Sequence, residues 1–169
     1  MKLRIALPVV WTLVALTTTA TSAAAPAHLI SQPETINGIV IRTGIERLSY
    51  ISLRYFGVRP VYDVCMKQSS GAAPKQQDCA DTELTYQDDR LNHVYESLLT
   101  VLDDLDRRAA VEAQRAWLTF RDKDCAARAG RFGSDAGPAT ESTCRMESTA
   151  YRAQQLEDWR NSVRDALIY

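Results

Sequence analysis

The chain has 169 residues, of which 46% are hydrophobic and 24% charged, and its formal net charge is −1. This length fits a single domain with a hydrophobic core of its own. The slightly acidic balance argues against binding to nucleic acid, which depends on neutralising phosphates with Lys and Arg.

The first 27 residues have the layout of a cleavable signal peptide: two positive residues, a mostly apolar stretch over 5–16 and small residues over 17–25. The apolar stretch is short for a transmembrane helix, and no later segment is apolar enough to span a bilayer. We expect cleavage after Ala25-Pro26-Ala27, with Ala23-Ala24-Ala25 as a second candidate that Pro26 disfavours. The mature chain is then periplasmic or secreted. It keeps no stable membrane anchor, because no cysteine near the cut could carry a lipid.

Residues 28–62 are predicted to form an N-terminal extension of uncertain structure. Asn37-Gly38 is typical of a turn, and Ile36–Ile41 has an extended pattern. Thr43 and Glu46 match a capping box and predict a helix over Gly44–Phe56. A strand remains the alternative there, because the segment is rich in β-branched and aromatic residues.

Four cysteines form two close pairs in the sequence, Cys65 with Cys79 and Cys125 with Cys144. An even number of cysteines in a small exported protein indicates a disulfide framework. Each bridge is worth about 2–4 kcal/mol, mostly through restriction of the unfolded chain. The polar residues 68–77 between the first pair predict a crosslinked loop.

Three helices are predicted after this loop. The first starts with Asp81 as its N-cap and carries leucines every seven residues, at Leu84, Leu91, Leu98 and Leu105. The second runs from about 108 to 129. Three glycines and Pro138 over residues 130–140 predict a break, followed by a third helix from about 143 to 167. Its inner stripe is expected to include Cys144, Tyr151, Leu156, Trp159, Val163 and Leu167.

Nine acidic residues and one basic residue, Arg90, lie between Asp78 and Asp106. Such a segment would repel nucleic acid and accelerate the encounter with a cationic protein. A solvated helix face is the alternative interpretation. Asp103, Asp104 and Asp106, at the end of this segment, are candidates for contact with a partner.

Two charged residues interrupt rows that otherwise look buried: Asp88 on the first helix and Arg121 on the second. Burying either alone would be costly, so we expect the two to pair across adjacent antiparallel helices. The second helix has one face that carries Ala110, Gln114, Trp117, Arg121 and Cys125. The polar residues beside the helical stripes are expected to hydrogen-bond helix ends and loop carbonyls, namely Asn92, Gln114, Thr149 and Arg152.

The residues show no recognisable catalytic set, and the sequence predicts neither an enzyme, a metal site nor a cofactor. His93 is isolated within the helical region, and the cysteines are committed to disulfides. Asp103, Asp104 and Asp106 do not form a carboxylate pair, because neighbouring positions on a helix point apart. Neither a nucleophile–base pair nor a phosphate-binding glycine motif is present.

The segment between Cys125 and Cys144 is the best candidate for binding another molecule. It carries Arg128, Arg131, Phe132 and Ser134, and a disulfide would join its ends. Arg and aromatic residues often anchor interfaces, and a braced loop loses less entropy on binding. The alternative is an ordinary connection between helices.

The order of these residues resembles a known family. Asp88-x-x-Leu91-Asn92-x-x-Tyr95 is followed by Gln114-x-x-Trp117-x-x-x-Arg121-Asp122-x-x-Cys125 and by Thr149-x-x-Arg152. This pattern is similar to the LprI-type lysozyme inhibitors, a family of small exported bacterial helical proteins. The resemblance covers about Cys65 to Leu156. The stretch 28–62 looks like an addition to the family pattern, and the lipid anchor of some members is missing.

We therefore expect an all-α protein: a disulfide-stapled helical hairpin and a long C-terminal helix in a domain over 63–169, preceded by the extension over 28–62. The resemblance implies a non-enzymatic inhibitor of a lysozyme or muramidase in the bacterial envelope. Two alternatives stay open: an immunity protein against a secreted muramidase toxin, and an envelope adaptor without a glycosidase partner.

Overall fold

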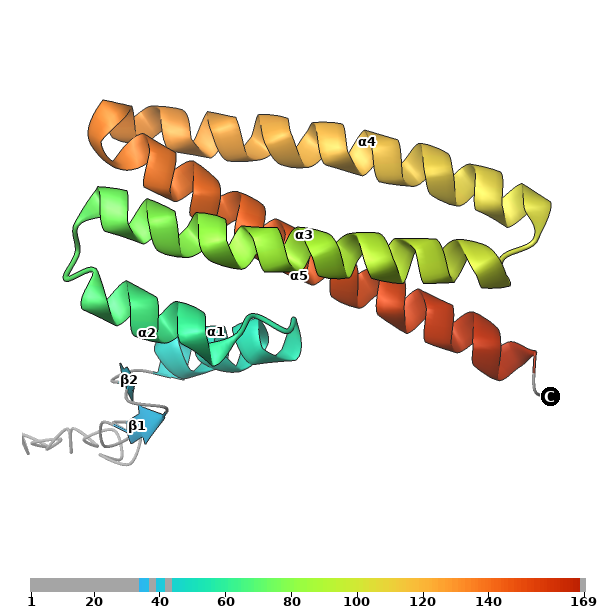
Figure 1. The fold of residues 1–169 in the computed structure, drawn as a ribbon, viewed down its shortest axis with the longest axis horizontal. Coiled ribbons are helices and arrows are strands. Elements are labelled where there is room, and N and C mark those ends of the chain that lie inside the picture. Colours follow the sequence, from blue (N-terminus) through green and yellow to red (C-terminus); the bar gives the residue numbers. More distant parts are fainter. Residues whose placement is uncertain (1–33, 37–38, 42–43, 168–169) are drawn as a thin grey trace, which may run out of the picture. The chain divides into compact units, whose positions relative to one another are not determined.

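The structure, a computed structural model, describes residues 34–36, 39–41 and 44–167, which lie in one compact unit, Ser31–Tyr169. The described residues form five α-helices and a short antiparallel strand pair (Figure 1). The helices are α1 (Gly44–Tyr55), α2 (Pro60–Gln68), α3 (Ala73–Val101), α4 (Asp104–Ala129) and α5 (Gly133–Ala166). The strands are β1 (Glu34–Ile36) and β2 (Ile39–Ile41), and a 3₁₀ turn, η2 (Gly130–Phe132), joins α4 to α5. The prediction of a helical hairpin followed by a long C-terminal helix is confirmed.

The N-terminal part contains the helix that its capping signals predict. Helix α1 begins at Gly44, as predicted, and ends at Tyr55. Gly57 follows with φ +82°, and a Cβ there would lie 2.6 Å from Nη1 of Arg90, so only glycine fits without rearrangement. The extended pattern corresponds to β1 and β2, in which Glu34 pairs with Ile41. The predicted turn at residues 37–38 and the predicted signal peptide lie outside the described residues.

The turn between α2 and α3 is much shorter than the predicted loop over 68–77, and the N-cap predicted at Asp81 is wrong. Helix α3 begins at Ala73, because Pro74 stands in its first turn, where a missing N–H breaks no helical hydrogen bond. The chain reverses through Ser70 and Gly71, which both have positive φ. The Ser69 hydroxyl donates a 2.7 Å hydrogen bond to the Met66 carbonyl and closes the turn.

The turn between α4 and α5 is also tighter than predicted. Helix α4 begins at Asp104, earlier than expected, because the Asp103 carboxylate accepts hydrogen bonds from the N–H groups of Leu105 and Asp106. The predicted break over 130–140 is wrong, because α5 already begins at Gly133. Pro138 lies only in the second turn of α5, so it removes a single backbone hydrogen bond.

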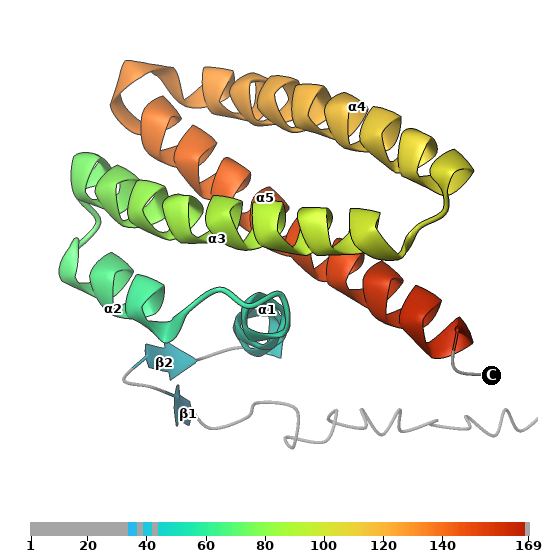
Figure 2. The same ribbon diagram turned by 45° about the vertical axis from the view of Figure 1, so that its right-hand side comes forward.

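Helices α3 and α5 share the most extensive helix–helix contact, and α5 crosses behind α3 in both views (Figures 1 and 2). Ala150 and Ala153 of α5 are fully buried and let the two helices approach closely. By contrast, Tyr151 and Leu167, expected on the inner stripe, are exposed. Leu105 is exposed as well, because α3 has already ended at Val101.

Two clusters of buried side chains form the core. One joins α3, α4 and α5 through Leu91, Val94, Leu98, Leu102, Ala110, Ala153 and Leu156. The other joins α2 and the segment before it to α3 and α5 through Val58, Tyr62, Cys79, Ala80, Met146 and Ala150. Because Tyr62 belongs to the second cluster, the boundary predicted at 62/63 falls inside a packed helix.

A buried carboxylate, Glu83, fixes the start of α2 to α3. Glu83 is 1% exposed and accepts hydrogen bonds of 2.9 Å from both the backbone N–H and the Nε of Arg59. Gln87 donates to Glu83 at 2.9 Å and to the Gly57 carbonyl at 2.8 Å. The charge is thereby fully hydrogen-bonded, as a buried charge must be.

A second ion pair links α1 to α2. Asp63 is buried and lies 3.0 Å from Nη2 of Arg54. Burial raises the pKa of the Asp63 carboxyl, and the attraction of Arg54 opposes this rise only in part. Asp63 therefore binds its proton more readily in the folded chain than in the unfolded chain. The stability gained from protonated Asp63 is full at low pH and is lost as the pH rises through the folded pKa.

Candidate functional site

Each disulfide closes a helical hairpin at its turn. Cys65 of α2 is bonded to Cys79 of α3, and Cys125 of α4 is bonded to Cys144 of α5, with Cα–Cα distances of 5.7 and 5.5 Å. Both predicted pairings are confirmed. The second bridge lies beside a close approach of the helices, where a Cβ at Gly137 would lie 3.3 Å from the Ala129 carbonyl oxygen.

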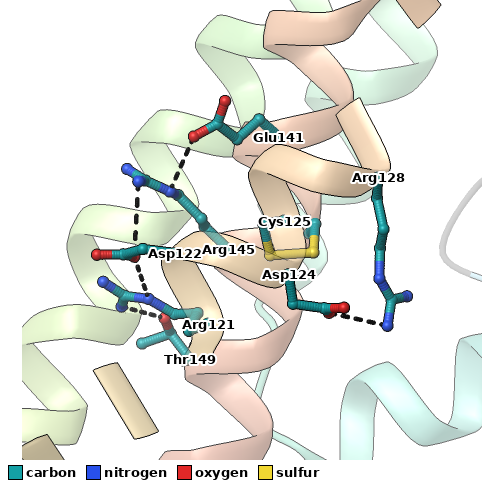
Figure 3. The surroundings of a disulfide bond; sticks show 9 residues. Arg121, Asp122, Asp124, Cys125, Arg128, Glu141, Arg145 and Thr149 are labelled. Atoms are coloured by element: carbon teal, nitrogen blue, oxygen red, sulfur yellow. Dashed lines mark hydrogen bonds and ion pairs between the residues drawn. A yellow bond between two sulfur atoms is a disulfide. The ribbon is translucent and has the colours of Figure 1, made fainter. Parts of the chain in front are cut away.

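The α4–α5 turn places the predicted binding residues at an exposed apex, defined here as Arg128, Arg131, Phe132 and Ser134. Arg128 forms a 2.9 Å ion pair with Asp124 (Figure 3). Arg131 makes no ion pair within the part of the chain that the structure describes, and the Phe132 ring is 52% exposed. The apex therefore presents a guanidinium and an aromatic ring on a backbone braced by a disulfide.

The structure brings Asp88 and Arg121 together. Nη1 of Arg121 donates to Asp88 at 3.2 Å and to the Thr149 hydroxyl at 2.9 Å, and Nε donates to Asp122 at 3.0 Å. Figure 3 shows Arg145 continuing this network between Asp122 and Glu141. Arg121 is only 11% exposed, but Asp88 is 44% exposed. The pair therefore lies at the edge of the core.

Trp117 lies between two guanidinium groups. The ring centroid is 5.3 Å from the Cζ of Arg121 and 5.7 Å from that of Arg152, within the range of cation–π attraction. Burial lowers the pKa of Arg152 below its usual value, and its Nε donates to the buried Gln114 amide oxygen at 3.0 Å. Asn92, predicted with this group, is exposed on α3.

The acidic segment divides into two sets. Glu83 is buried and Asp88 is paired, whereas the remaining acids are exposed: Asp78, Asp81, Asp89 and Glu96 on α3, and Asp103, Asp104 and Asp106 at the start of α4. Asp103 caps α4, and Asp104 forms a 2.9 Å ion pair with Arg107. Exposed acids along α3 and at the α3–α4 turn thus form an acidic surface, named here by those seven residues.

Sequence reasoning counted Glu83 among the nine acids and did not single out Gln87, so it missed that both belong to the core. Glu83 lies two helical turns and Gln87 one helical turn before Leu91 on its row, and both are buried. The sequence feature that could have revealed them is the four-residue spacing of positions 83, 87 and 91, which places all three on one face of the helix.

One group of potential metal-ligating atoms occurs among the described residues, formed by Asp124, Cys125 and Cys144. The two sulfur atoms are bonded to each other, so they do not offer the thiolates that a metal requires. No helix in the described part of the chain combines the length and the apolar character of a membrane span.

The exposure of Arg121 and Asp88 predicts unequal effects of removing each partner. We expect Arg121→Ala to lower the free energy of unfolding by about 2 kcal/mol, because the buried Thr149 hydroxyl and the partly buried Trp117 ring lose their partner. Asp88→Ala should cost less than about 1 kcal/mol, because a half-exposed ion pair contributes little. Urea denaturation of both variants measures the difference, and equal losses would contradict this assignment.

These features define a class of protein: small, helical and stapled at two hairpin turns, with a polar network between its helices. Residues 65–156 match the family model described as Lysozyme inhibitor LprI, and the chain belongs to this family. The match begins at the first disulfide cysteine and ends at Leu156 in the core. No curated protein and no solved structure matches the chain. The family's description implies a protein partner such as a lysozyme, and the disulfides agree with a location outside the cytoplasm.

Proposed function

We propose that this protein is a non-enzymatic inhibitor that binds a lysozyme or muramidase in the periplasm or outside the cell. The observation that carries the proposal is the family match over 65–156, which includes both disulfides. The apex and the acidic surface supply two features that an inhibitor of such an enzyme needs. One is a rigid projection, and the other is a charge that attracts the enzyme.

The acidic surface increases the rate at which the protein associates with the enzyme in this proposal. Its exposed carboxylates on α3 and at the α3–α4 turn produce a negative potential on this part of the molecule. Lysozymes that attack bacteria from outside are commonly basic, so opposite charges increase the association rate. This contribution weakens as the salt concentration rises, because exposed charges are screened.

The apex blocks the active-site cleft of the enzyme in this proposal. Glycosidases of this kind use two carboxyl groups in an open cleft, and Arg131 is a cation without an intramolecular ion pair in the described chain. Its guanidinium can pair with a cleft carboxylate while Phe132 packs on the cleft wall. The Cys125–Cys144 bridge holds the turn in place before binding, which reduces the entropy lost.

A titration of lysozyme activity with the purified, disulfide-bonded protein tests the proposal. We expect activity on bacterial cell walls to fall in proportion to added protein, with complete loss near one inhibitor per enzyme. Full activity at a several-fold excess, against both host-type lysozymes and bacterial muramidases, would reject it and favour the envelope adaptor. Inhibition of one dedicated bacterial muramidase alone would favour an immunity protein.

Replacement of Arg131 by alanine is expected to raise the inhibition constant about tenfold, which corresponds to the loss of one charge-assisted contact. The melting temperature should not change, because Arg131 is exposed. Arg115→Ala is a matched control. Arg115 is an exposed arginine like Arg131, but it lies on α4 and not at the apex. Equal inhibition constants for the two variants would remove Arg131 from the contact.

A further inference from the structure

One long face of α5 is hollowed. Three hollows of about 320, 320 and 330 Å³ lie along it. The first and third share Ser148 and Tyr151, the first and second share Glu147, and the second and third share Arg128. Neighbouring hollows share lining residues, so the three lie side by side along α5; this row of adjacent hollows is named the trench here.

The trench is long, and different helices flank its hollows: α4 flanks the third, and α1 flanks the first. The α4 wall includes Trp117, Phe120 and Asp124, and the α1 wall, with the residues after the helix, includes Leu53 and Phe56. The floor runs from about residue 140 to residue 155, which is about 22 Å at 1.5 Å per residue. This is the length of several linked sugar rings.

Rigid aromatic rings line the trench. Two guanidinium groups hold Trp117, and the Tyr151 ring packs edge-on against Phe56 at a centroid distance of 4.8 Å. Phe120 is 62% exposed and Tyr151 is 46% exposed, so both rings present surface to solvent. Phe120 and Tyr151 therefore offer exposed ring surface to a ligand, whereas guanidinium groups lie over the Trp117 ring.

Between the rings, the trench is polar and nearly neutral. Thr140, Ser148 and Gln155 place hydroxyl and amide groups along the floor. Two carboxylates and two guanidinium groups balance each other: Glu147 and Asp124 against Arg121 and Arg128. Donors and acceptors alternate with apolar rings, and this combination matches a sugar, whose C–H faces stack on rings while its hydroxyl and amide groups form hydrogen bonds.

We propose that this trench binds an oligosaccharide of N-acetylated amino sugars, the class of glycan that lysozymes cleave. The choice of glycan within the sugars rests on the proposed function, whereas the trench chemistry by itself indicates an uncharged oligosaccharide. Arg131 and Phe132 do not line the trench. The protein can thus hold a cell-wall glycan along α5 and leave Arg131 and Phe132 free for the enzyme, although Arg128 of the apex also lines the trench.

Binding is tested on the disulfide-bonded protein with the tetrasaccharide of β-1,4-linked N-acetylglucosamine. Trp117 reports it directly, because the sugar changes its fluorescence, and the only other tryptophan after residue 27 is Trp159. We expect a saturable fluorescence change in the micromolar to millimolar range. Phe120→Ala and Tyr151→Ala should each weaken binding about tenfold, the size of one lost aromatic contact. Both variants should keep the parent melting temperature.

Phe132→Ala is the matched control, because Phe132 is a similarly exposed ring outside the trench. It should bind the sugar like the parent and inhibit lysozyme less. No binding at millimolar sugar, or equal affinity in all three variants, would overturn the proposal. Loss of lysozyme inhibition by the trench variants, without any sugar binding, would assign the trench to the enzyme instead. If the sugar binds and lysozyme is unaffected, the proposed function fails and this inference stands.

Discussion

Replacement of Arg59 by alanine is expected to lower the free energy of unfolding by about 3–5 kcal/mol, because it leaves the Glu83 charge without its partner. Glu83 is 1% exposed in the folded chain, so its carboxylate depends on donors from the protein. The remaining donors to the carboxylate are the backbone N–H of residue 59 and the Gln87 amide. Neither carries a positive charge that would offset the cost of burial.

The double variant Arg59→Ala/Glu83→Gln is the control for this prediction. An uncharged amide of the same shape has a far smaller desolvation cost, so the double variant should be more stable than Arg59→Ala alone. Chemical denaturation followed by circular dichroism gives both values. A loss below about 1 kcal/mol in Arg59→Ala would mean that the ion pair behaves like an exposed one.

Removal of the Cys125–Cys144 disulfide by paired Cys→Ser substitutions is expected to cost about 3 kcal/mol. The bridge closes a segment with a sequence separation of 19 residues, and the chain-entropy model gives this value for such a loop. The native helices keep their contacts, so the folded state should persist with a lower melting temperature. The measurement is the unfolding free energy under non-reducing conditions.

A comparison with the Cys65–Cys79 bridge sharpens this prediction. Its sequence separation of 14 residues gives a similar entropic value of about 3 kcal/mol. If the two paired variants lose similar amounts, restriction of the unfolded chain accounts for both. A loss near zero in either one would show that native packing compensates for the missing bridge.

The helices that carry the polar network could be predicted because helical periodicity reveals which residues share a face. Gln114, Trp117 and Arg121 were assigned to an inner row of a helix, and the structure places them there. The contact between Asp88 and Arg121 followed from the cost of leaving either charge alone beside a core. Their degree of exposure did not follow, because it depends on the distance between helices.

The helix starts were the main errors, and two of them involve prolines. Pro138 was interpreted as part of a break and Pro74 lies in the stretch predicted as a loop, yet each stands within the first two turns of a helix. Glu83 was missed for a different reason. A polar residue on a helix is expected to face solvent, and its partner, Arg59, lies 24 residues earlier in a segment that the family pattern does not include.

The candidate binding residues were selected by composition, and their setting could not be derived from it. Arg131 and Phe132 were expected in an irregular loop, whereas they lie on a three-residue 3₁₀ turn. Gly133, with φ +64°, then lets the chain reverse its direction into α5. The trench along α5 was not predicted at all. It requires α1 and α4 to flank the same face of α5, and sequence spacing within a helix does not contain that information.

The position of the two bridges has a consequence for survival among extracellular proteases. Each bond spans the tight turn of one hairpin, and turns are where chains are most easily cut. A protease that cleaves beside Gly71 or Gly130 would leave two fragments still joined through sulfur. Such a nicked molecule would run as intact on a non-reducing gel and would keep both helices of the hairpin in register.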